Sequence, residues 1–197
     1  MIDRRKSLPR TLAFSAGVLA LFYLIGCGGS SVFIDPTFDF GYVERVAIVP
    51  FDNLSQQTQV LGKQATLAFT TELLSRKAFG IVEPGETAKV MADLNLTRPG
   101  GAPDMAQIQE MGKRLKVQGL IFGSVSQTSM VRSGLTNNPV ITLDVRLVET
   151  ESGATVWAAS RSAGRPGFFS TLFGVGGKAD SEVLRQCIDE VLGTLIK

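Results

Sequence analysis

Few side chains in this 197-residue sequence could act as nucleophiles or proton-transfer groups near neutral pH. The chain contains no histidine, which excludes Ser-His-Asp and Cys-His nucleophiles and imidazole-based zinc sites. Its two cysteines, Cys27 and Cys187, form no CxxC pair, so there is no redox motif and no thiolate metal cluster. No pair of acidic residues stands at a recognisable catalytic spacing. We therefore expect a protein that is not an enzyme and that uses no cofactor and no metal.

The segment before Cys27 gives that cysteine a specific context. Four basic residues between positions 4 and 10 precede an apolar run over residues 12–25, which small residues follow. This layout is typical of a secretory signal peptide. The run of about fourteen apolar residues is shorter than the ~20 that a membrane-spanning helix needs. The sequence therefore predicts export rather than a transmembrane anchor.

Leu24-Ile25-Gly26-Cys27 closes this segment and resembles a bacterial lipobox. The resemblance implies that the thiol of Cys27 takes a diacylglyceryl group, and the small Gly26 leaves the cleaved bond accessible. Gly28 stands where lipoproteins of the inner membrane often carry Asp, which favours the periplasmic face of the outer membrane. Two or three acyl chains would anchor the protein stably. The alternative is an uncleaved anchor, or an ordinary signal peptide with an incidental cysteine.

Processing at this site would divide the chain into a signal peptide (residues 1–26), a lipidated leader (27–44) and one domain (45–197). The formal net charge of the whole chain is +2. Removing residues 1–26 leaves 16 Lys and Arg against 17 Asp and Glu, a side-chain charge of −1. A near-neutral domain is not expected to bind nucleic acid.

The leader begins with Gly and Ser, which favours flexibility, but then becomes too apolar for a solvated linker. Phe38, Phe40 and Tyr42 alternate, which predicts one face of an extended segment lying against the domain. Even fully stretched, the seventeen residues 28–44 would span about 60 Å. The domain is therefore expected to lie close to its membrane.

Hydrophobic periodicity predicts the element order β-α-β-α-α-β-β-β-α. The expected strands cover about 45–51, 79–83, 119–129, 140–149 and 154–162, and the expected helices about 60–77, 84–94, 104–115 and 180–196. Asp52 and Asn53 are expected to form a turn after the first strand, and Asp104 to cap a helix together with Gln107. The predicted fold is an α/β sandwich of two or three layers, with helices packed on a mixed sheet.

The predicted helix 60–77 carries apolar residues on two sides. One stripe comprises Val60, Leu67, Leu74 and Ala78, and the other comprises Leu61, Ala65, Ala68, Phe69 and Leu73. One stripe should cover the sheet. The second is either a face between subunits or a product of the alanines and a loose helical phase.

The glycine-rich segment 164–177 contains four large apolar residues, Phe168, Phe169, Leu172 and Phe173. Exposed apolar groups of this size would be unfavourable in water. The segment is therefore either a tip that contacts a partner or a membrane, or a loop that folds back over the core of its own domain.

Several motifs, in order, resemble one superfamily of bacterial lipoproteins. They are Val46-Ala-Ile-Val-Pro-Phe51, Asp52-Asn53-Leu-Ser55, Gly119-Leu-Ile-Phe-Gly-Ser-Val125, Leu143-Asp-Val-Arg-Leu-Val148 and Val156-Trp157. The superfamily includes CsgG-type curli-secretion lipoproteins, LpoB-type activators of peptidoglycan synthases and the N-terminal domain of TolB-type proteins. The resemblance covers about residues 43–196. It implies a TolB N-terminal-like fold and a non-enzymatic envelope domain that binds or assembles with proteins.

Two departures limit what this resemblance implies. A CsgG-type pore inserts two hairpins near residues 127–139 and 163–178, and each membrane hairpin needs ~20 residues plus a turn. Those windows hold 13 and 16 residues. An LpoB-type activator has a long tether, whereas this leader is short. We expect an outer-membrane lipoprotein that assembles with envelope proteins or copies of itself, as in a secretion scaffold. The alternative is a regulator of a peptidoglycan synthase.

Overall fold

The computed structural model describes residues 30–55, 60–96, 103–133, 136–164 and 179–196. Within them, seven strands form one sheet in the order β1-β7-β6-β5-β2-β4, and β3 also pairs with β5. The strands are β1 (Ser30–Ile34), β2 (Arg45–Ile48), β3 (Asp52–Asn53), β4 (Gly80–Val82), β5 (Gly119–Ser133), β6 (Thr136–Glu149) and β7 (Thr155–Ala163). The α-helices are α2 (Leu61–Arg76), α3 (Pro84–Asp93), α4 (Met105–Leu115) and α6 (Asp180–Leu195).

The sheet contains both parallel and antiparallel pairs. β2 pairs in parallel with β4 and β5, whereas β5, β6, β7 and β1 pair antiparallel in turn. The parallel connection from β2 to β4 runs through α2, since parallel strands need a long crossover. The main elements from β2 to α6 follow the predicted order, so the predicted α/β class with a mixed sheet is confirmed.

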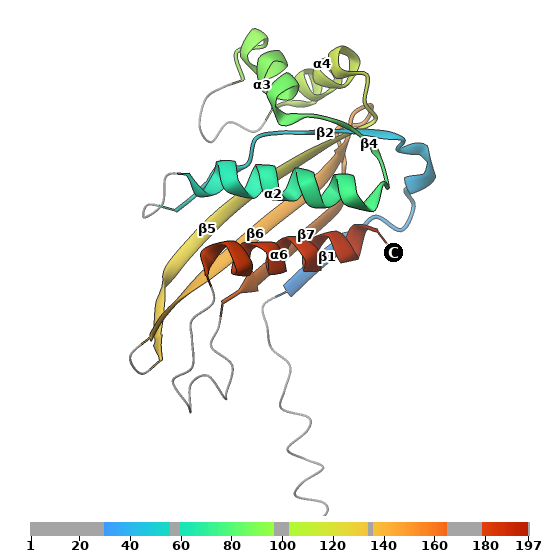
Figure 1. Ribbon diagram of the computed structural model, residues 1–197. Coiled ribbons are helices and arrows are strands. Elements are labelled where there is room, and N and C mark those ends of the chain that lie inside the picture. Colours follow the sequence, from blue (N-terminus) through green and yellow to red (C-terminus); the bar gives the residue numbers. More distant parts are fainter. Residues whose placement is uncertain (1–29, 56–59, 97–102, 134–135, 165–178, 197) are drawn as a thin grey trace, which may run out of the picture.

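The two ends of the sheet differ in thickness (Figure 1). α2 and α6 lie side by side over one face, and their apolar side chains enclose the larger hydrophobic cluster with that face. α3 and α4 cover the other face only at one end, where a smaller cluster joins them to β2, β4 and the start of β5. The sandwich therefore has three layers at the α3–α4 end and two at the opposite end.

The larger cluster shows which of the two predicted stripes of α2 covers the sheet. In α2 the buried apolar residues are Leu61, Ala65, Phe69 and Leu73. Trp157 of β7 is fully buried beneath α6, and its indole N–H donates to the hydroxyl of Thr194 at 3.1 Å. Fully burying a large side chain contributes about 1.5–3 kcal/mol, so this face holds the main stabilising contacts.

The predicted cap of the 104–115 helix is confirmed. Asp104 Oδ1 accepts a hydrogen bond from the backbone N–H of Gln107 at 2.8 Å, and Gln107 Oε1 accepts one from the backbone N–H of Asp104 at 2.9 Å. These bonds satisfy two donors that a helix start would otherwise leave unpaired. The sequence thus specified the local start of α4.

The predicted turn at Asp52 and Asn53 is wrong. These residues form β3, which pairs in parallel with Ser124 and Val125 of β5. Pro50 has no N–H to donate and separates β2 from β3, but both strands pair with β5, so the chain continues in one direction along it. The proline therefore interrupts the ladder without reversing the chain.

The segment from residue 30 to residue 44 also differs from the expected single extended face. Asp39 accepts a hydrogen bond from the Gly41 N–H and begins a 3-10 turn over Phe40–Tyr42. Phe38 and Phe40 pack against the larger cluster, whereas Tyr42 is exposed. The strand in this region is β1, which pairs with β7. The sheet therefore begins inside the part of the chain expected to be leader.

β5 and β6 form a longer hairpin than predicted. Their pairing continues to Ser133 and Thr136, with an irregularity between Thr128 and Val131. Backbone hydrogen bonds between strands need no apolar alternation, which explains why hydrophobic periodicity missed this extension. No helix in the described part of the chain is long and apolar enough to cross a bilayer.

Candidate functional site

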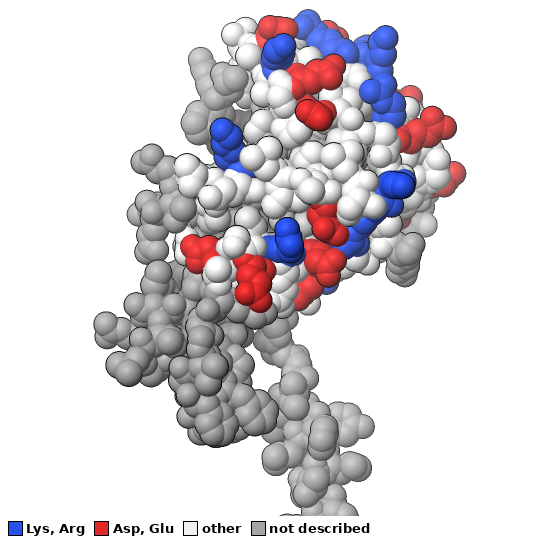
Figure 2. Space-filling view, viewed as in Figure 1, with Lys and Arg blue, Asp and Glu red and all other residues white. Residues whose placement is uncertain are grey.

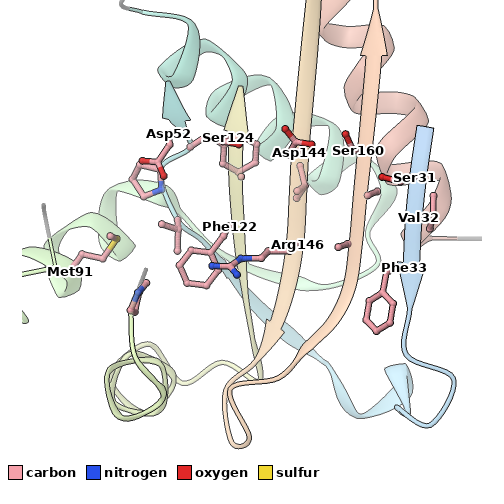
Figure 3. A pocket seen from close by; sticks show the side chains of 18 of the residues that line it. Ser31, Val32, Phe33, Asp52, Met91, Phe122, Ser124, Asp144, Arg146 and Ser160 are labelled. Atoms are coloured by element: carbon pink, nitrogen blue, oxygen red, sulfur yellow. The ribbon is translucent and has the colours of Figure 1, made fainter. Parts of the chain in front are cut away.

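A groove of about 880 Å³ lies where the second face of the sheet has no helix over it (Figure 3). Its floor comes from β5, β6 and β7, with Phe33 of β1 on one side and Met91 of α3 on the other. The small Ala158 of β7, which lies opposite Arg146 and Phe33, keeps the floor shallow between them. The groove exists because α3 and α4 stop short of this part of the sheet.

Strand register brings five polar residues into one row across the groove. Ser124 lies opposite Asp144, and Asp144 lies opposite Ser160. Asp52 of β3 and Ser31 of β1 extend this row at its two ends. Neighbouring strands are about 4.8 Å apart, so the row crosses about 19 Å of sheet. It presents two carboxylates and three hydroxyl groups to the groove.

The adjacent row is largely apolar. It contains Phe122, Arg146, Ala158 and Phe33, in strand order from β5 to β1. The guanidinium carbon of Arg146 lies 5.1 Å from the centre of the Phe122 ring, a cation–π contact that Figure 3 shows from close by. Charge is therefore present on both rows, positive on one and negative on the other.

The side chains of the two rows offer several kinds of contact to a ligand. Within the described residues, no three His, Cys, Asp or Glu side chains gather in a group that could hold a metal ion. The hydroxyl groups of Ser31, Ser124 and Ser160 face a groove whose described lining contains no imidazole and no amine. An imidazole or an amine is the usual base that activates a serine or threonine nucleophile. The groove can offer hydrogen bonds, charge and apolar contact to a ligand.

A second candidate surface is the outward face of α2. Val60, Leu67 and Leu74 are 54%, 56% and 50% exposed and lie seven residues apart, so they fall on one line along the helix. Figure 2 shows charged residues over α3 and α4 and along α6, while the middle of α2 between them is largely uncharged. We call these three residues the α2 stripe. The second predicted stripe therefore contains large apolar side chains that the described part of the chain leaves exposed, as a face between subunits would.

The remaining predicted site residues lie outside the described part of the chain. They are the lipidation site Cys27 and the predicted contact residues Phe168, Phe169, Leu172 and Phe173. The chain enters the latter segment from Gly164, directly after β7, and leaves it at Ala179, directly before α6. The lipidation of Cys27 and the contact role of the four apolar residues remain predictions.

Cys187 is a buried core residue. Burial raises the pKa of its thiol to about 11, outweighing a hydrogen bond with the backbone of Ala163 that lowers it. Its Sγ lies 3.5 Å from the carbonyl oxygen of Ile141. A thiol that stays protonated is a poor nucleophile, so Cys187 serves packing.

Sequence reasoning missed the groove itself. Along residues 140–149, Thr142, Asp144 and Arg146 alternate with buried apolar residues, which places them on the face away from the main core. The residues that share a row with Asp144 or Arg146 lie 12–113 residues away in the chain, from Ala158 to Ser31. Only the pairing of β1 with β7 and of β6 with its neighbours brings them together.

No family model matches the chain, and no curated protein matches its sequence. Among solved structures, the chain is similar to the PelC dodecamer from Paraburkholderia phytofirmans, with a TM-score of 0.58 and 18% identity over 86% of this chain and 98% of that one. It is similar to lipoprotein GNA1162 from Neisseria meningitidis, with a TM-score of 0.50 and 17% identity over 77% and 97%. A looser likeness is to the LpoB C-terminal domain from Salmonella enterica, with a TM-score of 0.47 and 14% identity over 66% and 88%.

At these identities the likenesses show a shared fold. One of the structures that share the fold, GNA1162, is itself a bacterial lipoprotein. The CsgG-type part of the sequence resemblance is not shown by these structures. The fold therefore belongs to the class of mixed α/β domains that occurs in bacterial lipoproteins.

Proposed function

We propose that this chain is a non-catalytic lipoprotein of the periplasmic face of the outer membrane, whose domain assembles with other protein subunits, including copies of itself. The lipid on Cys27 would hold it at the membrane, and the folded domain would act by contact. Its fold is shared with PelC, which is described as a dodecamer. The α2 stripe is the observation that carries the proposal.

The α2 stripe suits a subunit contact for two physical reasons. Its three side chains are half exposed or more although they are large and apolar, and nothing in the described part of the chain covers them. Contiguous exposed apolar surface is typical of interaction sites rather than of isolated monomers. The stripe also lies on a regular helix that is itself fixed by Phe69 and Leu73 beneath it. A partner would therefore meet a rigid surface.

Light scattering after size exclusion of the full, acylated protein in detergent tests this proposal. We expect the wild-type protein to have the mass of several chains. Leu67→Glu would place an unpaired charge in the contact, which costs several kcal/mol, and should shift the protein towards one chain. Ser181→Glu on α6 makes the same charge change at an exposed site and should leave the mass unchanged.

A wild-type protein that elutes as one chain would contradict self-assembly. That outcome would favour the alternative, a monomeric regulator of a peptidoglycan synthase, which a crosslinking pull-down from membranes would then reveal. The anchor has its own test. Cys27→Ala should move the protein out of the membrane fraction, and a variant that stays bound would contradict lipidation at this residue.

A further inference from the structure

The chain between the proposed lipid and the sheet is very short. Ser30 already lies in β1, opposite Arg161 of β7. Only Gly28 and Gly29 stand between Ser30 and Cys27. Three residue steps span at most about 11 Å. If Cys27 carries the lipid, as proposed above, the start of β1 is held within this distance of the acylated residue.

The hairpin of β5 and β6 extends from the same end of the sheet. Ser30 lies opposite Arg161, which lies opposite Leu143 of β6. β6 continues in the direction of the tether from Leu143 back to Thr136, where it pairs with Ser133 of β5. Figure 1 shows this hairpin projecting past the ends of β7 and β1.

The projecting part of the hairpin is longer than the tether. Seven residue steps separate Leu143 from Thr136, which at about 3.3 Å each gives about 23 Å. The tether, residues 27–30, spans at most about 11 Å along that direction. The hairpin end therefore reaches the level of the anchored Cys27 for any tilt of the strands up to about 60° from the membrane normal.

We propose that the end of the β5–β6 hairpin enters the lipid interface of the membrane that holds Cys27. Residues 126–133 and 136–140 contain one charged residue, Arg132, so few charges would have to leave water, and a cationic residue is favourable in a layer of anionic lipid headgroups. With the strands upright, the end would pass the anchor by about 12 Å, less than half of the ~30 Å hydrocarbon core. The hairpin is thus a surface contact that sets the orientation of the domain, and it does not span the bilayer.

A single introduced thiol can test this contact in the full, acylated protein. Ser133→Cys places the probe at the hairpin end, and Lys113→Cys on α4 places a matched probe at the opposite end of the sheet. The native thiols do not interfere, because that of Cys27 is consumed by the lipid and that of Cys187 is buried with a pKa of about 11. Both variants are labelled with an environment-sensitive fluorophore and reconstituted into phosphatidylethanolamine–phosphatidylglycerol vesicles.

We expect a nitroxide lipid with its spin label near the headgroup to quench the Ser133 probe and to leave the Lys113 probe unchanged. Equal quenching at both positions, or a Ser133 probe shielded from water but not quenched by lipid, would overturn the proposal. The latter result would place the hairpin end against a neighbouring protein subunit.

Vesicle flotation of the same samples separates this inference from the function on which it rests. Protein that floats with the vesicles but shows no quenching at Ser133 overturns only the hairpin contact. Acylated protein that fails to float overturns the lipid anchor and the hairpin contact together.

Discussion

The two faces of the sheet are made by the same strands but have different cover. On β6, Ile141, Leu143, Val145 and Leu147 face α2 and α6 and are buried. On the opposite face, Asp144 and Arg146 are exposed in the groove, whereas Val148, which lies next to α4, is buried. Side-chain polarity thus follows helix cover position by position along one strand. The comparison indicates that the open half of the sheet is built for solvent or a ligand.

The largest effect is expected on the fully covered face. Trp157→Ala would leave a cavity beneath α6 and remove the hydrogen bond to Thr194, and should lower the free energy of unfolding by about 3–5 kcal/mol. Chemical denaturation measures this change. Trp157→Phe keeps most of the side-chain volume and should lower the free energy of unfolding by clearly less than Trp157→Ala does. Equal losses for the two variants would show that the cavity is not the cause.

A smaller effect is expected where α4 covers the second face. A Cβ at Gly112 would lie 2.5 Å from Cβ of Thr150, so Gly112→Ala should cost about 1–3 kcal/mol of stability through overpacking. Gly193→Ala in α6 is the matched control, since no atom lies within 4 Å of its added Cβ. There alanine should stabilise the helix by about 0.5–1 kcal/mol. Opposite signs in thermal denaturation would confirm the close approach of α4 to the sheet.

The smallest effect is expected in the open groove. Arg146→Ala removes an exposed contact with the Phe122 ring and should change the free energy of unfolding by less than about 1 kcal/mol. Arg146→Lys keeps the charge and should change it even less. A loss comparable to that of Trp157→Ala would contradict the distinction between the two faces.

Local sequence patterns predicted what depends on neighbouring residues. The prediction that one apolar stripe of α2 covers the sheet and the capping box at Asp104 were correct, because helix periodicity and capping involve residues at most a few positions apart. The alternation of β6 was correct for the same reason. The end of α2 was also predicted to within one residue: the helix ends at Arg76, and Lys77 adopts the left-handed conformation that ends it.

Features that depend on distant pairing were missed. β1 pairs with β7 across more than 120 residues, and β3 pairs with β5 across about seventy. Neither Ser30–Ile34 nor Asp52–Asn53 shows the apolar alternation that marks a half-buried strand. These two strands form because β7 and β5 offer them backbone N–H and C=O groups to pair with. A sequence pattern does not show which distant segment offers such groups.

By itself the sequence determined the α/β class, the order of the main elements and the two apolar stripes of α2, since these follow from periodicity along the chain. It also supplied the hypothesis that Cys27 carries a lipid. Only the tertiary structure decided that the sheet starts two residues after Gly28, at Ser30, and that one sheet face stays half open. The physical reason is that tether length, groove and hairpin overhang all depend on strand register, which joins residues far apart in the chain.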